Sequence, residues 1–364
     1  MSFPYNFIRN IFRITLPSLI FVFLILEIFF RYVIPATQVP YAYYDRTDQI
    51  LRFDTSKNVT GVSTIGKFAE TRARWRINNF GWNSNIDYYP TRKSPLIAII
   101  GDSYAEAFQV DVDKNFVAII REKLNHKYDV YSFGFSGWAL SDYLQLSRYV
   151  NKHFNPDILA INVVHNDFSE SLCYVHPSFG TLCLKVKPAQ ISEATIIPYH
   201  SNIIRRTLSK SSVVRYLYIN LNIKRLIKDI IQLFNKGAYN YSANVDLEKI
   251  KMQREDIMKA TNYVLNKLKK ENPNKIIIIM MDAPRKDIYE NNLRESKAIW
   301  LNNMMKEKCK ETGIIFIDLT KPFSELYSLN HVKYESQNDG HWNEYGHRVA
   351  AEALYNKLKE MGLF

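Results

Sequence analysis

Short apolar runs alternate with amphipathic stretches along most of the chain. The runs are short enough to be buried strands, and they lie at residues 96–100, 128–133, 157–164, 275–281 and 313–318. Stretches with apolar residues at helical spacing follow them, at residues 104–123, 140–153, 247–270, 296–312 and 345–361. Apolar strands that alternate with helices predict a parallel sheet covered by helices on both faces.

One apolar stretch near the amino terminus is much longer than these strands. Residues 14–34 would span roughly 32 Å as a helix, which matches a bilayer core of about 30 Å. Glu27 and Arg31 lie four residues apart within it, so the two charges can neutralise each other on one helical face. We interpret the stretch as an uncleaved membrane anchor. A cleaved signal peptide is the alternative, although no A-x-A-like cleavage site follows.

Charges and cysteines bear on the orientation of this anchor. Arg9 and Arg13 precede the span, a slight bias for an internal amino terminus and an external remainder of the chain. We therefore expect a single-pass protein of the inner (plasma) membrane with its main domain in the periplasm. Cys173 and Cys183 are ten residues apart, and a disulfide between them would suit that compartment, although two thiols fit the sequence equally well.

The chain divides into three expected parts. Residues 1–35 form the anchor, residues 36–94 a juxtamembrane connector that packs on the domain, and residues 95–364 the α/β domain. An insertion at about residues 170–244 interrupts the domain. Its basic stretch at residues 201–236 contains a single acid, Asp229, among interleaved apolar residues. This stretch is either an amphipathic segment lying on an anionic membrane or a solvated helical cap over the rim of the site.

Charge limits the choice of partners. The formal net charge is +12 and the pI is near 9.3, but most of the basic residues are scattered. No zinc-finger or RNP motif accompanies them, so we expect a membrane rather than a nucleic acid as the anionic partner. No C-x-x-C or similar metal-ligand spacing occurs, and we expect neither a metal nor a cofactor.

A candidate nucleophile follows the first strand of the predicted sheet. Ser103 comes after Gly101 and Asp102, directly beyond the apolar run 96–100 and at the start of a helix. Parallel α/β sheets bind ligands outside the carboxyl ends of their strands, and a helix start presents N–H groups to an oxyanion. The tripeptide alone is equally typical of a turn with a capping aspartate.

A serine needs a base, and His341 is the best candidate among the eight histidines. Asp339 precedes it by two residues in a loop before the last helix, from where a carboxylate can reach the imidazole Nδ1. The alternative is that Asp339 only shapes the turn and His341 lies on the surface. His347 falls inside the last helix, where we expect a structural role.

Donors for an oxyanion follow two other strands. Asn166 ends the strand 157–164 and can offer its side-chain amide, and Gly137 follows the strand 128–133 and can offer a bare backbone N–H. Both residue types are also common in ordinary turns. Ser136 is a rival nucleophile, but Trp138 stands where a G-x-S-x-G motif requires glycine.

Taken in order, these blocks resemble the SGNH (GDSL-type) hydrolase family. The resemblance covers residues 96–363 apart from the insertion. It implies a flavodoxin-like three-layer α/β/α sandwich, with Ser103 as nucleophile and Asp339 and His341 as its partners. It also implies an oxyanion hole made by the N–H groups of Ser103 and Gly137 and the side chain of Asn166.

Two departures and two local likenesses refine this expectation. His165 stands where the family usually has glycine, which would narrow the pocket or add a donor, and Asn338 stands where the aspartate usually lies. Residues 76–82 resemble a stretch in membrane-anchored members from bacterial surface-polysaccharide loci. The Asp-x-His-Trp step at residues 339–342 resembles alginate O-acetylation proteins.

The resemblance leads to an expected function. We expect a serine esterase that removes acyl groups, O-acetyl above all, from a cell-surface glycan, with polysaccharide-biosynthesis proteins as further partners. The alternatives are an O-acetyltransferase that uses the same triad and an inactive glycan-binding or scaffold member.

Overall fold

The computed structural model describes residues 3–56, 59–125, 127–175, 179–188, 190–197, 207–221, 241–242, 245–336 and 339–364. Contacts divide the chain into two compact units. The apolar-helix unit comprises Met1–Val39, Val62–Arg72 and Ser201–Gly237, and the sheet unit comprises Pro40–Gly61, Ala73–His200 and Ala238–Phe364.

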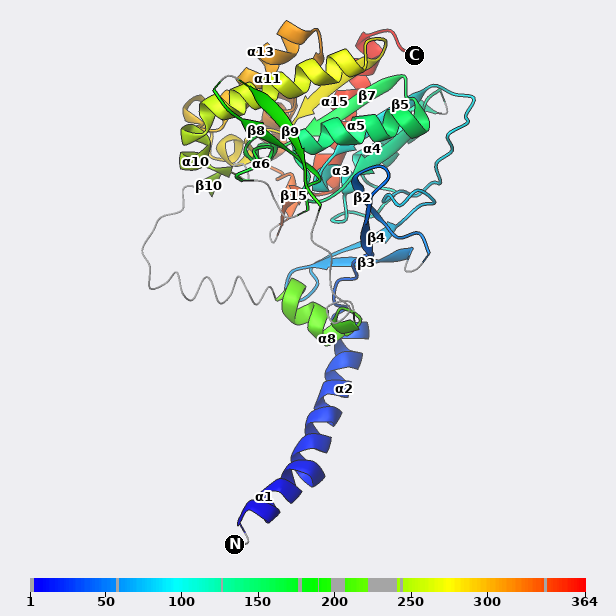
Figure 1. Ribbon diagram of the computed structural model, residues 1–364, viewed down its shortest axis with the longest axis vertical. Coiled ribbons are helices and arrows are strands. Elements are labelled where there is room, and N and C mark those ends of the chain that lie inside the picture. Colours follow the sequence, from blue (N-terminus) through cyan, green and yellow to red (C-terminus); the bar gives the residue numbers. More distant parts are fainter. Residues whose placement is uncertain are drawn as a thin grey trace. The chain divides into compact units, whose positions relative to one another are not determined.

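A five-stranded parallel sheet forms the centre of the sheet unit, in the order β13-β12-β7-β5-β6. Its strands are β5 (Leu96–Gly101), β6 (Asp129–Gly134), β7 (Ile158–Val163), β12 (Ile276–Met281) and β13 (Ile315–Asp318). Two of its strands, β5 and β7, are labelled in Figure 1. Counted from β5, the order is 2-1-3-4-5, which is that of flavodoxin-like folds. The expected α/β fold with a parallel sheet is therefore confirmed.

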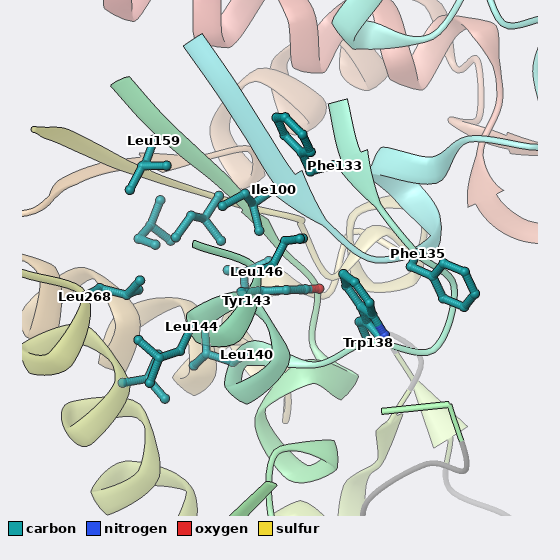
Figure 2. Packing of buried hydrophobic residues seen from close by; sticks show 14 of the residues in the cluster. Ile100, Phe133, Phe135, Trp138, Leu140, Tyr143, Leu144, Leu146, Leu159 and Leu268 are labelled. Carbon is teal, nitrogen blue, oxygen red and sulfur yellow. The ribbon is translucent and has the colours of Figure 1, made fainter. Parts of the chain in front are cut away.

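Alternate residues of each strand pack on opposite faces of this sheet. Ile97 and Ile99 join one hydrophobic core, while Ala98 and Ile100 join the other. Figure 2 shows the core that contains Ile100, to which Phe133 and Leu159 come from other strands and Tyr143 and Leu144 from helix α5 (Leu140–Phe154). Each strand is thus buried on both faces, which is why it reads as a continuous apolar run.

Helices supply the two outer layers. The core that contains Ile100 is closed by α5 (Leu140–Phe154), α11 (Arg254–Glu271) and α13 (Ile299–Thr312). The core that contains Ile99 is closed by α4 (Phe116–Leu124), α12 (Arg285–Tyr289), α14 (Thr320–Asn330) and α15 (Glu344–Glu360).

The continuous helix expected through residue 123 is wrong. The chain forms α3 (Ser103–Glu106) and α4 instead, because Ala107 adopts a left-handed conformation with φ of 56° and ends α3. Helix α4 starts anew where the side chain of Asn115 accepts a hydrogen bond from Ala118 N at 2.9 Å. The stretch 247–270 is likewise two helices, α10 (Leu247–Met252) and α11.

Smaller elements surround the sheet. Trp82, from the connector, is fully buried and packs edge-to-face on Trp138. A disulfide joins Cys173 to Cys183, which lies in β8 (Leu182–Val186), and β8 pairs with β9 (Ile191–Thr195). This bond settles the alternative left open by the sequence. The remaining elements of the sheet unit are β1 (Ala42–Asp45), β2 (Ile50–Phe53), α6 (Asn166–Glu170), β10 (Tyr241–Ser242), β11 (Val245–Asp246), η3 (Leu293–Glu295), β14 (Glu335–Ser336) and β15 (Asp339–Trp342). Strands β3 (Thr60–Ile65) and β4 (Thr71–Arg76) each contain residues of both units.

The apolar-helix unit begins with α1 (Phe3–Asn10), η1 (Ile11–Thr15) and α2 (Leu16–Tyr32). Phe7–Tyr32 is a continuous helix of 26 residues, long and apolar enough to cross a membrane. From the insertion the unit takes α8 (Ser212–Arg215) and η2 (Tyr216–Asn220). The other basic residues expected there lie outside the described residues, namely Arg205, Arg206, Lys224, Arg225, Lys228 and Lys236.

Candidate active site

The residues singled out in the sequence meet at the carboxyl edge of the sheet. Ser103 follows β5, Gly137 follows β6 and Asn166 follows β7. The order of the strands reverses between β5 and β7, so Ser103 and Asn166 flank the switch point where open α/β sheets place their ligands.

A glycine lets helix α3 approach the neighbouring strand. A Cβ on Gly134 would lie 2.3 Å from Glu106 N and 2.5 Å from the carbonyl carbon of Ala105, so no larger residue fits there. Asp102 caps the same helix, because its Oδ1 accepts a hydrogen bond from Tyr104 N at 2.9 Å. The capped turn that the sequence offered as an alternative is therefore present, and it is what positions Ser103.

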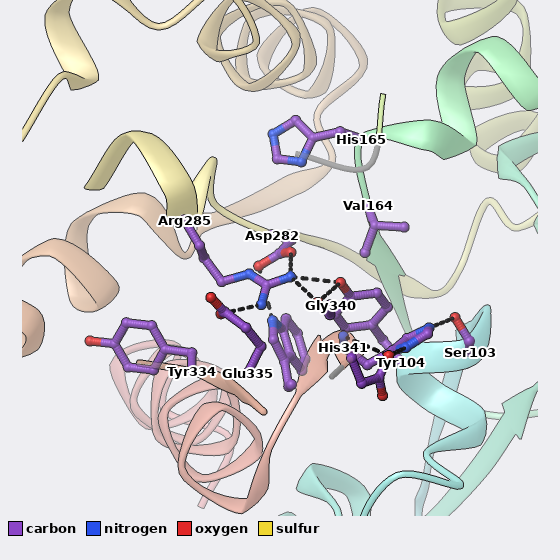
Figure 3. A network of polar contacts seen from close by, with 12 residues as sticks. Ser103, Tyr104, Val164, His165, Asp282, Arg285, Tyr334, Glu335, Gly340 and His341 are labelled. Atoms are coloured by element: carbon purple, nitrogen blue, oxygen red, sulfur yellow. Dashed lines mark hydrogen bonds and ion pairs between the residues drawn. The ribbon is translucent and has the colours of Figure 1, made fainter. Parts of the chain in front are cut away.

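A chain of hydrogen bonds links Ser103 to His341 and Asp339. Figure 3 shows its first link, from Ser103 to His341. Ser103 Oγ lies 2.7 Å from His341 Nε2, and His341 Nδ1 lies 2.6 Å from Asp339 Oδ1. A carboxylate only accepts, so Nδ1 carries the proton and Nε2 is free to accept the hydroxyl proton. The side chain of His341 remains 34% exposed, which leaves it within reach of solvent.

Burial and neighbouring charges shift the pKa values of His341 and Asp339. Burial lowers the pKa of His341, but the hydrogen bond and charge of Asp339 outweigh it and raise that pKa above its ordinary value. Burial acts against ionisation of Asp339, yet its hydrogen bond to His341 holds the pKa of this carboxyl below its usual range. The pair thus favours an imidazolium beside a carboxylate, which is the state that follows proton abstraction from a serine.

Three candidate hydrogen-bond donors for an oxyanion lie at the same carboxyl edge of the sheet. Gly137 has φ of +82°, and no hydrogen bond from its N–H or from that of Ser103 is found within the described residues. Asn166 Nδ2 donates one proton to Glu170 Oε2 at 2.9 Å and has a second to offer. Asp167 holds this turn, because its Oδ2 accepts hydrogen bonds from Val164 N and from the hydroxyl of Tyr143, each at 2.8 Å.

His165 does not reach this edge. It is 1% exposed, and its Nε2 lies 2.9 Å from Asn302 Oδ1 beneath α13. In Figure 3 its ring points away from Ser103, so the expectation that it narrows the pocket or adds a donor is wrong. Asn338, the other departure from the family pattern, lies outside the described residues.

His347 and Ser136 make hydrogen bonds outside the chain that links Ser103, His341 and Asp339. His347 is buried in α15, where its Nδ1 accepts a hydrogen bond from Phe116 N and burial lowers its pKa to about 3. It is therefore a neutral structural histidine. Ser136 donates its hydroxyl proton to the carboxyl of Glu106, so this rival has no imidazole partner within the described residues.

Arg285, which the sequence reasoning missed, holds the segment that carries His341, and this segment is strand β15 rather than the loop expected from the sequence. Its guanidinium donates to Gly340 O and to the hydroxyl of Tyr104, each at 2.7 Å, and pairs with Glu335 at 2.7 Å (Figure 3). Asp282 lies 3.3 Å from the same guanidinium and accepts the indole N–H of Trp342 at 3.0 Å. The available signal was its position, just beyond the carboxyl end of β12.

Glu106 was missed as well. It is 3% exposed, and burial raises its pKa to about 7. Its carboxyl accepts a hydrogen bond from Ser136, the residue before Gly137, while its backbone oxygen accepts one from Asn83 Nδ2 at 2.7 Å. Glu106 therefore ties together the nucleophile turn, the connector and the loop of Gly137.

A metal has no evident place here. The described residues hold no group of three or more histidine, cysteine, aspartate or glutamate side chains that could bind one. The expected absence of a metal and of a cofactor remains a prediction.

Several solved structures are similar to this chain. A search of curated proteins found no match. Among solved structures, the chain resembles a lipolytic G-D-S-L family member from Veillonella parvula (11% identity, 72% of this chain and 97% of the other, TM-score 0.41). It also resembles an acetyl xylan esterase (14% identity, 72% and 99%, TM-score 0.40). A third similar structure is a two-domain esterase active on acetylated mannans (10% identity, 73% and 49%, TM-score 0.41).

A family model gives the assignment. The model of the GDSL-like lipase/acylhydrolase family matches residues 99–349, which is more than half of the chain and includes Ser103, Gly137, Asn166, Asp339 and His341. The protein therefore belongs to the GDSL-like lipase/acylhydrolase family and is a serine ester hydrolase.

Proposed function

We propose that Ser103 is the nucleophile of this esterase, that His341 is its general base and acid, and that Asp339 orients and stabilises the imidazolium. The observation that carries the proposal is the continuous chain from Ser103 Oγ through His341 to Asp339, at 2.7 and 2.6 Å. Hydrogen-bonded contact between nucleophile and base, with the base held by a third group, is the geometry that nucleophilic catalysis requires.

The proposed reaction has two halves. Ser103 Oγ attacks the acyl carbonyl carbon while its proton passes to His341 Nε2. The oxyanion is held by the N–H groups of Ser103 and Gly137 and the amide of Asn166. The alcohol oxygen then leaves with the proton from His341, and water attacks the acyl-enzyme with His341 again as base. The partial exposure of His341 favours water over a sugar hydroxyl as acceptor, and hence hydrolysis over transfer.

The substrate we propose is an acylated, above all O-acetylated, glycan of the cell surface. The Cys173–Cys183 disulfide and the 26-residue apolar helix favour a membrane-anchored enzyme that works outside the cytoplasm. Phe179 is 48% exposed and lies 3.5 Å from where a Cβ on Gly137 would be. Its ring offers an apolar face to a sugar beside the proposed oxyanion donor.

The test measures ester hydrolysis by the full-length protein in detergent. Ser103→Ala should lose about 10⁴–10⁶-fold in kcat on a soluble acetyl ester, because the step through the acyl-enzyme is removed. A fluorophosphonate probe should label the wild type and not the variant. The matched control is Ser328→Ala, an exposed serine on α14, which should keep full activity and labelling.

Retention of wild-type activity by Ser103→Ala would overturn the assignment of the nucleophile. The glycan is tested separately, by acetate release from an acetylated oligosaccharide and by acetyl transfer to an unacetylated one. Phe179→Ala should raise KM on the oligosaccharide by about 10-fold while leaving the small ester unaffected, since an aromatic contact is worth about 1.4 kcal/mol. An equal effect on both substrates would contradict the proposed sugar contact.

A further inference from the structure

Within the part of the chain that the structure describes, most of the apolar helix Phe7–Tyr32 is left uncovered by other segments. None of its most apolar 18-residue window is buried, and Phe12, Phe21 and Leu19 are each more than 60% exposed. At about 1.5 Å per residue the helix is about 39 Å long, enough to cross a hydrocarbon core of about 30 Å. Lipid is the environment that covers such a surface on all sides.

A later part of the chain is attached to the polar group inside this helix. The carboxylate of Glu27 accepts hydrogen bonds from Ser211 Oγ at 2.8 Å, Ser212 N at 2.9 Å and Val213 N at 3.1 Å. Arg31 completes the cluster at 2.6 Å. Helix α8 therefore starts on Glu27, and removal of the apolar helix would leave its first N–H groups without their acceptor.

The contacts continue toward the end of α2. The ring of Tyr216 stacks on Phe30 with centroids 3.8 Å apart, and Asn220 Oδ1 accepts a hydrogen bond from Thr37 N at 3.0 Å. Asn220 Nδ2 also donates to Thr64 Oγ1 at 3.0 Å. Residues 211–220 thus follow the chain from Glu27 to Thr37. Glu27 lies five residues before the end of α2, or about 7.5 Å along the axis, within the 5–10 Å to which interfacial segments are buried.

The exposed side chains of this segment suit a bilayer surface. Leu208, Leu217 and Ile219 are 52%, 38% and 41% exposed. Residues 207–221 contain the basic residues Lys210 and Arg215 and no acidic residue. Apolar side chains beside basic residues, in a segment without an acid of its own, are the composition of segments that lie in the interface of an anionic membrane.

We infer that residues 207–221 form a membrane-surface segment, docked on the end of the apolar helix, that inserts its apolar side chains between anionic phospholipid headgroups. Of the two roles that the sequence allowed for the basic insertion, this inference selects the amphipathic segment on an anionic membrane over the solvated helical cap. The inference does not depend on the proposed catalytic residues. It further requires that the apolar helix is retained as an anchor, since the segment is built on Glu27.

The test places a fluorescent label on the segment in the full-length protein. Leu217→Cys, labelled with nitrobenzoxadiazole, is reconstituted in phosphatidylcholine vesicles with and without 30% phosphatidylglycerol. Lipids brominated near the headgroup serve as quenchers. Cys309 is buried and the other two cysteines are bonded, so the introduced thiol is the accessible one. Leu329→Cys, at a 79% exposed leucine of α14, is the matched control.

Quenching at position 217 should be several-fold greater than at position 329 and should increase by about twofold with phosphatidylglycerol. Lys210→Glu in the Leu217→Cys background should abolish that increase. Quenching no greater at 217 than at 329 would overturn the proposal in favour of a solvated segment, and so would an increase that survives Lys210→Glu. Soluble-ester activity of each sample establishes that the labelled protein is folded, independently of these outcomes.

Discussion

The two units of this protein bury polar side chains in different settings. In the sheet unit, apolar residues fill both cores, and polar groups such as Asp102, Glu106 and Arg285 are buried together at the carboxyl edge of the sheet. In the apolar-helix unit the apolar side chains of the long helix are exposed, and the hydrogen bonds of Glu27 to the start of α8 are partly buried. The difference teaches that a polar cluster supports the candidate active site in one unit and attaches α8 to the long helix in the other.

If this comparison holds, the largest effects on activity come from the hydrogen-bond chain at the edge of the sheet. Asp339→Asn should lower kcat by about 10⁴-fold, because the amide no longer favours the productive tautomer. Activity needs neutral His341, so it rises with pH through the raised pKa of that residue. Loss of the Asp339 charge lowers this pKa, and the rising limb of kcat/KM should move to lower pH.

The pH profile of the purified enzyme measures this shift. Asp113→Asn, at an exposed aspartate, is the matched control and should leave the profile unchanged. A rising limb that stays in place in Asp339→Asn would contradict the assigned role of Asp339.

Arg285→Gln tests the polar cluster around Arg285, which holds strand β15 and with it His341. Removing this cation leaves Asp282 buried without its ion-pair partner, so unfolding should become easier by about 3–5 kcal/mol. Among folded molecules, kcat should fall while KM changes little, and the pKa of His341 should rise because the Arg285 charge lowers it. Thermal melting, steady-state kinetics and a pH profile measure the three effects. A selective rise in KM would place Arg285 against substrate instead.

Glu106→Gln tests a buried acid that lies outside the hydrogen-bond chain. Because burial raises its pKa to about 7 from 4.5, the folded state binds more protons than the unfolded state between these pH values. Stability therefore falls as pH rises from about 4.5 to 7, by up to about 3 kcal/mol from this group. The variant should lose this part of the slope, as measured by melting temperature against pH. An unchanged slope would show that Glu106 does not titrate there.

Glu27→Gln should have the smallest effect on catalysis. None of the partners of Glu27 belongs to the site, so kcat on a soluble ester in detergent should stay within about twofold of the wild type. A tenfold loss would break the division of roles between the two units. Steady-state kinetics at matched protein concentration provide the measurement.

The amino-acid sequence by itself determined the fold class and indicated the main members of the candidate site. Strands buried on both faces must be apolar throughout, so their runs were visible without any structure. Ser103, Gly137 and Asn166 each follow such a strand, and parallel strands bring their carboxyl ends to one edge. The apolar helix was visible as well, because an apolar run much longer than a strand stands out in the sequence.

Only the tertiary structure decided how the long-range polar contacts are made. Nothing local indicates that Arg285 would reach Gly340, 55 residues away, or that Glu27 would cap a helix 185 residues later. The break after α3 was also not predicted, because the left-handed conformation of Ala107 does not change the hydrophobic periodicity. The burial of His165 was not predicted either, because its partner Asn302 lies on the distant helix α13. Hydrophobic periodicity records which side chains leave water, whereas the pairing of buried polar groups depends on which distant segments the finished core brings together.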